Sequence, residues 1–327
     1  MTEGSTPAGA AGAVHQLLGF GLRVSRSRMV RWGFGLVAVA LAVWAGVSRR
    51  HEVLQALHRL EPGWLALGLL ATLGNSGTNA MAWRRMLADL GSRLPLASTA
   101  RVFFVGQLGK YVPGSVWPMV MQAEMASDHG IARRRTAAAT VVTMLVSIAC
   151  GLLVVLVTLP FVPQIVPPGF GWTVFLVVPL LVVLHPAVLD RVINTALVRL
   201  GRDPLEHRTS LRGTAATTAW ALVAWLLAGL QVWALAVSLG APMTGRTLAL
   251  ATGGYALAWA VGFVVVIAPA GAGAREVALI AVLATVLDRG AVLVVVLLSR
   301  VLFTLADLGL AGLGLSVGRA HRSTPAG

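Results

Sequence analysis

Long apolar runs, separated by short polar segments, make up most of the chain. A helix that crosses the hydrocarbon core of a membrane needs about 20 mostly apolar residues. Runs of roughly that length predict spanning helices at residues 32–48, 64–83, 136–159, 172–189, 217–239 and 291–314. Tryptophans lie near several predicted ends, where interfacial aromatic side chains belong: Trp32, Trp64, Trp83, Trp172 and Trp220.

Two further apolar segments are interrupted in the same way. Each has a glycine seven residues before a proline: Gly106 and Pro113 in the first, Gly262 and Pro269 in the second, 156 positions later. The breaks divide the segments into arms at 99–108 and 119–127, and at 248–268 and 275–287. A ten-residue helix is about 15 Å long, half the hydrocarbon thickness, so the first segment predicts a re-entrant hairpin. In the second, the longer arm could instead span completely, and its partner with it.

The same offset predicts an internal repeat that relates residues 64–159 to residues 217–315. It carries Trp64 onto Trp220 and Asn75 onto Gln231. Each half reads as a span, a re-entrant hairpin and a span, and the second half starts from the opposite face of the membrane. We therefore expect an all-α polytopic membrane protein built on an inverted repeat. Its hairpin tips would meet near the membrane centre and enclose a wet cavity.

Composition supports a membrane protein. The chain is 57% apolar and 12% charged, whereas soluble domains contain about 25% charged residues. The net charge of +14 comes from arginines clustered beside apolar runs, which is typical of cytoplasmic loops rather than of nucleic-acid binding. The N-terminus and the segments 84–93, 133–135, 190–212 and 319–322 are therefore predicted to be cytoplasmic.

This orientation gives a predicted domain organisation. A disordered basic tail at 1–29 precedes a single membrane domain at 30–318, and a disordered tail at 319–327 follows it. Within the membrane domain, the span at 172–189 and a basic cytoplasmic segment at 190–216 link the two repeat halves.

Catalytic chemistry is not visible in the sequence. The single cysteine, Cys150, lies in an apolar run, and the seven histidines are scattered. No nucleophile–base pair, carboxylate pair or nucleotide-binding loop is apparent. We expect no enzymatic activity, no metal site and no other cofactor.

Three short motifs occur in order. They are Gly106-Gln-Leu-Gly-Lys-Tyr-Val-Pro-Gly-Ser-Val-Trp117, then Pro269-Ala-Gly-Ala-Gly-Ala-Arg-Glu276, then Leu298-Ser-Arg300 with Asp307. Together they resemble the transmembrane region of bacterial lysylphosphatidylglycerol synthases, also called the flippase-like domain, over roughly residues 64–314. The resemblance implies a multi-pass protein of the bacterial plasma (inner) membrane. In the best-known members it also implies translocation of a modified anionic phospholipid between leaflets.

The chain departs from the synthases in two ways. They add a large soluble aminoacyl-transferase domain after the membrane part, whereas only residues 319–327 follow the last predicted span here. A stand-alone member without that activity is therefore expected. The first hairpin also carries the bulky Trp117, where the family usually has a small, Gly-rich tip.

Charged residues at the two breaks are the main candidates for a site. Lys110 is the only lysine among 26 basic residues. An ammonium group near the membrane centre should face a cavity or a phosphate, but in a shallow hairpin it would reach the inner headgroups. Arg275 could bind a lipid phosphate through its two-pronged guanidinium. Alternatively, an Arg–Glu pair involving Glu276 locks the hairpin to a neighbouring helix, which is the reading that we favour.

The last span and the second one add further candidates. Arg300 and Asp307 are seven residues apart, so they lie on one helix face but too far apart to pair. Arg300 could meet Glu276 or Glu124 instead. Asn75 lies in a polar patch that either joins helices or lines a cavity, and joining helices is the commoner role. The predicted substrate-binding residues are Asn75, Lys110, Pro113, Gly114, Pro269, Gly271, Gly273, Arg275, Glu276 and Arg300.

Two functions follow. The first is translocation of an anionic phospholipid or lipid-linked headgroup, with membrane lipids as the partners. The second is a non-transporting membrane partner, which would anchor a separately encoded glycosyltransferase or lipid-modifying enzyme through the arginine-rich segment 191–212. No nucleic acid is expected to bind.

Overall fold

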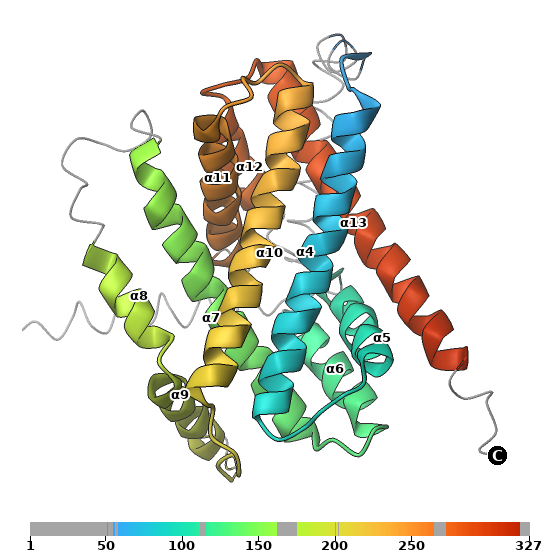
Figure 1. The fold of residues 1–327 in the computed structure, drawn as a ribbon, viewed down its shortest axis with the longest axis vertical. Coiled ribbons are helices and arrows are strands. Elements are labelled where there is room, and N and C mark those ends of the chain that lie inside the picture. Colours follow the sequence, from blue (N-terminus) through green and yellow to red (C-terminus); the bar gives the residue numbers. More distant parts are fainter. Residues whose placement is uncertain are drawn as a thin grey trace, which may run out of the picture.

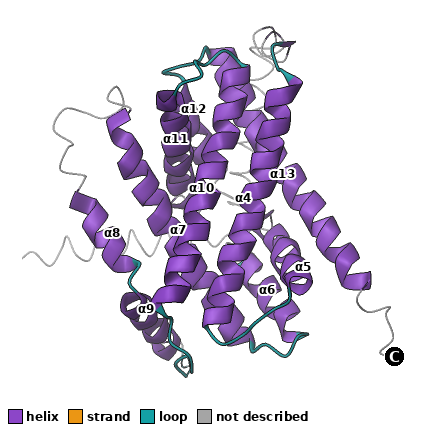
Figure 2. Cartoon of the chain, in the orientation of Figure 1, coloured by secondary structure: helices purple, strands orange, loops and turns teal. Residues whose placement is uncertain are grey.

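A computed structural model describes residues 51, 55, 58–111, 116–161, 175–199, 201, 203–264 and 273–320. All regular secondary structure within these residues is helical (Figure 2). The elements are α4 (Pro62–Asp89), α5 (Leu96–Gln107), the 3₁₀ helix η1 (Leu108–Tyr111), α6 (Trp117–Ser127), α7 (Arg133–Thr158), the 3₁₀ helix η2 (Leu159–Phe161), α8 (Val177–Val183), α9 (Pro186–Arg199), α10 (Leu211–Ser238), α11 (Gly245–Val264), α12 (Ala274–Leu283) and α13 (Arg289–Ala320).

Local sequence explains where many of these helices begin. Pro62 and Pro186 open α4 and α9, where the missing backbone N–H costs nothing because no intrahelical partner exists there. The hydroxyl of Ser210 caps α10 by accepting a hydrogen bond from the Gly213 N–H at 3.0 Å. Beyond these starts, the long helices α7, α10 and α13 are mostly apolar sequence.

The centre of the fold is the antiparallel pair α4 and α10 (Figure 1). Their buried faces are rich in small residues, among them Gly68, Ala71 and Ala80 on α4 and Ala221 and Ala228 on α10. Small side chains let the two backbones approach closely, which is how helices associate in membranes. α7 packs beside α10 and α13 packs beside α4, so the two flanking helices lie on opposite sides of the pair.

The two predicted hairpins are present, at opposite ends of the α4–α10 pair. In Figure 1, α5 and α6 enter from the lower end, whereas α11 and α12 enter from the upper end. Both hairpins reach roughly half-way along the bundle. α12 has ten residues, about 15 Å, and cannot cross a bilayer alone. Its length favours the re-entrant interpretation of the second hairpin.

Within the described residues, three helices are long and apolar enough to cross a membrane by themselves: α7, α10 and α13 as far as Ser316. They match the predicted spans 136–159, 217–239 and 291–314. α4, which covers the predicted span 64–83, is equally long, but polar side chains such as Asn75 and Asn79 interrupt its centre. Three leucine side chains on α13, those of Leu305, Leu308 and Leu313, are more than half exposed, which is typical of a lipid-facing surface.

The structure differs from the sequence prediction in three places. The span expected at 172–189 is a bent pair, in which α8 and α9 meet at 63°. Pro186 causes the break, because proline disfavours helical geometry in the residue before it. The segment 190–216 is largely helical, since α9 continues to Arg199 and α10 begins at Leu211. The tail expected from residue 319 begins later, because α13 runs to Ala320. The predicted span 32–48 and the tail 1–29 lie outside the described residues.

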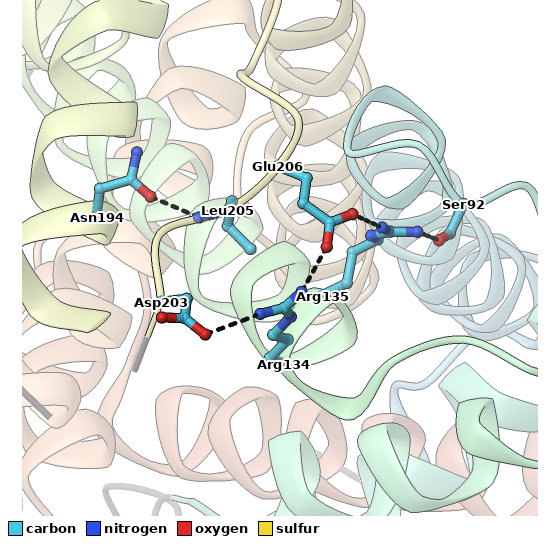
Figure 3. Close-up of polar contacts among 7 residues, drawn as sticks. All are labelled: Ser92, Arg134, Arg135, Asn194, Asp203, Leu205 and Glu206. Carbon is cyan, nitrogen blue, oxygen red and sulfur yellow. Dashed lines mark hydrogen bonds and ion pairs between the residues drawn. The ribbon is translucent and has the colours of Figure 1, made fainter. Parts of the chain in front are cut away.

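The basic segments 84–93, 133–135 and 190–212 gather at one end of the bundle. Glu206 accepts hydrogen bonds from Arg134 at 2.5 Å and from Arg135 at 3.0 Å, and Arg135 donates to the Ser92 hydroxyl at 2.9 Å (Figure 3). These contacts tie the segment before α10 to the start of α7 and the end of α4.

Candidate functional site

Two ion pairs join the centre of α13 to the two hairpins. Lys110 of η1 places its Nζ 2.6 Å from Asp307 Oδ2. One to two turns earlier on the same helix, Arg300 Nε lies 3.2 Å from Glu276 Oε1 of α12. Segments that are more than 160 residues apart in the sequence therefore meet on one helix, and the charged residues at both breaks belong to a single cluster.

Asp307 is the most buried member of this cluster. Its side chain is 7% exposed, whereas that of Lys110 is 37% exposed. The same Oδ2 atom also accepts a hydrogen bond from the Tyr111 hydroxyl at 2.6 Å. Because buried carboxylates need compensating donors, Lys110 and Tyr111 together stabilise Asp307 inside the bundle.

A close approach of two backbone segments shapes the first hairpin. A Cβ atom on Gly109 would lie 2.7 Å from the Pro118 nitrogen and 2.8 Å from the Trp117 carbonyl carbon. No side chain fits there, so only glycine lets η1 lie against the start of α6. This contact fixes the turn from which Lys110 and Tyr111 reach α13.

The start of α12 shapes the second hairpin. Gly273 has φ +93°, a conformation that glycine adopts without strain. Its N–H donates to Glu276 Oε2 at 2.5 Å, so Glu276 caps the helix that it belongs to. The other carboxylate oxygen pairs with Arg300. Glu276 therefore fixes the helix start and also locks it to α13.

Arg275 lies beside this cap. Its guanidinium carbon lies 4.5 Å from the centroid of the Tyr255 ring on α11, an arrangement typical of a cation–π contact. That ring stacks on Phe303 of α13, with centroids 5.6 Å apart, and Trp225 of α10 packs edge-on against it. Among the described residues, no carboxylate pairs with Arg275. Phe303 lies between Arg300 and Asp307 on α13, so the contact through Tyr255 places Arg275 beside the same part of that helix.

The structure brings together five of the predicted site residues: Lys110, Gly273, Arg275, Glu276 and Arg300. The alternative partner for Arg300 is excluded, because Glu124 pairs with Arg133 on the exposed surface at 2.6 Å. The sequence favoured an Arg–Glu ion pair that attaches the second hairpin to a neighbouring helix. Such a pair is present, but its arginine is Arg300 and not Arg275.

Asn75 has another role. Its Nδ2 donates to the Ala224 carbonyl of α10 at 2.7 Å, and its backbone carbonyl accepts from Asn79. It joins α4 to α10, and no contact links it to the charged cluster. Its predicted part in substrate binding therefore gains no support, while the role as an interhelical link does. Pro113, Gly114, Pro269 and Gly271 lie outside the described residues.

The predicted set of binding residues omits three residues at the cluster. Asp307 belongs to the cluster itself, and Tyr111 and Tyr255 contact it. A signal for the tyrosines was available, because the chain has only two. Both contact the cluster in the structure. A rare hydroxyl-bearing aromatic residue inside an apolar segment is itself a reason to expect a polar environment.

Comparisons with known proteins agree with this architecture. Residues 30–311 match the family model described as the lysylphosphatidylglycerol synthase TM region. The match includes both hairpins and every member of the charged cluster. A search of curated proteins finds no match.

Proposed function

The chain belongs to the lysylphosphatidylglycerol synthase TM-region family of flippase-like multi-pass membrane proteins, and from this premise we propose that it moves the headgroup of an anionic phospholipid or lipid-linked substrate between the two leaflets. One observation carries the proposal. Lys110, Arg275 and Arg300, which come from both hairpins and from α13, form one cluster beside the middle of α13.

Physical chemistry supports a functional role for this cluster. Ionisable groups at membrane depth cost several kcal/mol each unless they are paired or hydrated, so such groups are rare without a function. The side chains of Lys110 and Arg300 are 37% and 36% exposed, so the cluster is accessible rather than sealed. An anionic headgroup would enter this region while its acyl chains stay in the bilayer.

The arrangement of the hairpins supports transport in particular. α5–α6 and α11–α12 approach the cluster from opposite ends of the α4–α10 pair (Figure 1). This placement favours the predicted inverted repeat, in which each hairpin controls access from one side. We place the protein in the bacterial inner membrane, with its N-terminus and the basic end of the bundle in the cytoplasm.

The test is a leaflet-accessibility assay on reconstituted protein. A fluorescent anionic phospholipid is introduced into proteoliposomes, and a membrane-impermeant quencher reports the fraction exposed outside. Lys110→Ala and Arg275→Ala should slow exchange between leaflets strongly. Arg59→Ala is the matched control, because Arg59 forms an exposed pair with Asp288 outside the charged cluster, with side chains 57% and 60% exposed. Unchanged exchange in both cluster variants rejects these roles.

A specific observation also favours the second candidate, a membrane partner of a separately encoded enzyme. Arg191, Arg199, Arg208 and Arg212 are exposed and make no ion pair within the described residues. The acidic Glu206 is instead engaged with α7 (Figure 3). The segment therefore presents uncompensated positive charge. Charge reversal at Arg199 and Arg208 that releases a co-purifying enzyme, with lipid distribution intact, would favour this role.

A further inference from the structure

The charged cluster has an unequal number of positive and negative groups. Three cations, Lys110, Arg275 and Arg300, face two carboxylates, Glu276 and Asp307. Among the described helices around the cluster, residues 63–83 of α4 and residues 213–238 of α10 contain no charged residue, and the charged residue of α5 is a further cation, Arg101. No carboxylate on these segments compensates the difference. The five groups of the cluster therefore carry one net positive charge.

That charge belongs to one residue. Lys110 and Arg300 each contact a carboxylate, whereas among the described residues Arg275 contacts Tyr255 and no carboxylate. A guanidinium has five N–H donors, so Arg275 can contact Tyr255 and still offer a pair of donors spaced to bind two oxygens of one phosphate. Arg275 also opens α12, where the helix dipole adds partial positive charge. An anion would therefore bind at Arg275 without breaking either ion pair.

We propose that the site selects a headgroup with a single net negative charge, the charge class of a phosphodiester. This inference rests on the proposed function and narrows it. A monoanion brings the loaded site to neutrality, whereas a zwitterion leaves the positive charge unbalanced. A phosphate monoester or a diphosphate-linked lipid brings an excess negative charge instead. In a low-dielectric interior, either imbalance is costly, so charge matching decides which lipid enters.

The experiment measures leaflet exchange of three labelled phospholipids that share the same acyl chains. They are a monoanionic phosphatidylglycerol, a zwitterionic phosphatidylcholine and a phosphatidic acid, whose monoester carries about 1.5 to 2 negative charges at pH 7. The wild-type protein should prefer the monoanion over the other two by at least about ten-fold, because one unit charge at contact distance inside a protein is worth more than that factor.

Variants then shift the charge of the site by one unit. Arg275→Gln makes the site neutral, and the preference should move towards the zwitterion. Glu276→Gln and Asp307→Asn each raise the site to two net positive charges, and the preference should move towards phosphatidic acid. Two different carboxylates are used because either variant alone could fold poorly. Arg275→Lys keeps the charge and should keep the preference. Arg59→Gln and Asp288→Asn change the protein's charge equally, but within an exposed pair outside the cluster.

A binding measurement separates this inference from the proposed function. The protein's tryptophan fluorescence is titrated in detergent with short-chain forms of the same three lipids. Exchange without charge preference, or variants that do not shift it, overturns the inference and leaves transport standing. Selective binding of the monoanion without exchange overturns transport and supports the inference. If the protein shows neither leaflet exchange nor selective binding, both the inference and the proposed function are overturned.

Discussion

The contact between Lys110 and Asp307 predicts a measurable loss of stability when one partner is neutralised. In Asp307→Asn the side chain keeps its shape, but Lys110 loses its counter-charge. Exposed ion pairs contribute about 0–1 kcal/mol, whereas breaking a fully buried pair costs about 3–5 kcal/mol. Asp307 is 7% exposed and Lys110 is 37% exposed. The pair lies between these limits, so we expect the free energy of unfolding to fall by about 2 kcal/mol.

The assay is unfolding in mixed detergent and SDS micelles, followed by the fluorescence of the ten tryptophans. Lys110→Met and the double variant Lys110→Met/Asp307→Asn complete a double-mutant cycle. We expect a coupling energy of about 1–2 kcal/mol, because removing both charges relieves the penalty of leaving one unpaired. Asp288→Asn in the exposed pair with Arg59, the control, should cost no more than about 0.5 kcal/mol. Strictly additive effects of the two single variants would refute the reasoning.

Three further predictions follow from the packing and the topology. Gly109→Ala should destabilise the first hairpin and abolish leaflet exchange, because its Cβ would lie under 3.0 Å from the backbone of α6; Gly77→Ala, with nothing within 4 Å, should leave exchange intact. Thr140→Val should cost about 1–3 kcal/mol in the same unfolding assay, since Thr140 donates to Gln122 at 2.7 Å and accepts from Trp83 at 3.0 Å; an unchanged transition would show that this network contributes nothing. Single cysteines at Gly130 and Met243, in a chain carrying Cys150→Ala, should label with an impermeant reagent from opposite sides of the membrane, and labelling from one side contradicts the antiparallel arrangement.

The sequence predicts the helices well because the local sequence determines where each helix begins and ends. Long apolar runs define α7, α10 and α13, and the Gly–Pro spacing defines both hairpins. The bend between α8 and α9 was missed, because the run at 172–189 is mostly apolar and the effect of Pro186 depends on whether neighbouring helices support a straight continuation. The charged cluster was predicted only in part. Spacing shows that Arg300 and Asp307 share a face, but not which hairpin residue each one meets.

Partner choice was not predictable from the sequence for a physical reason. Whether Arg300 pairs with Glu276 or with Glu124 depends on which hairpin arm packs against α13, and that is a property of the assembled bundle. The polar residues of the central helices show the same limit. The repeat relates Asn75 to Gln231, yet Asn75 binds a backbone carbonyl of α10, while Gln231 accepts from Ser299 of α13. Similar positions in the two halves thus link different helices.

The attachment of both hairpins to α13 limits how the protein can open. The anchoring residues, Arg300 and Asp307, are about 10 Å apart on one rigid helix. If one hairpin swings away with its ion pair intact, it must carry α13 along and disturb the anchor of the other. In the transport cycle that we propose, the two hairpins would act as mechanically coupled gates, which could not open at the same time without breaking an ion pair. Such coupling would keep the bilayer tight to ions.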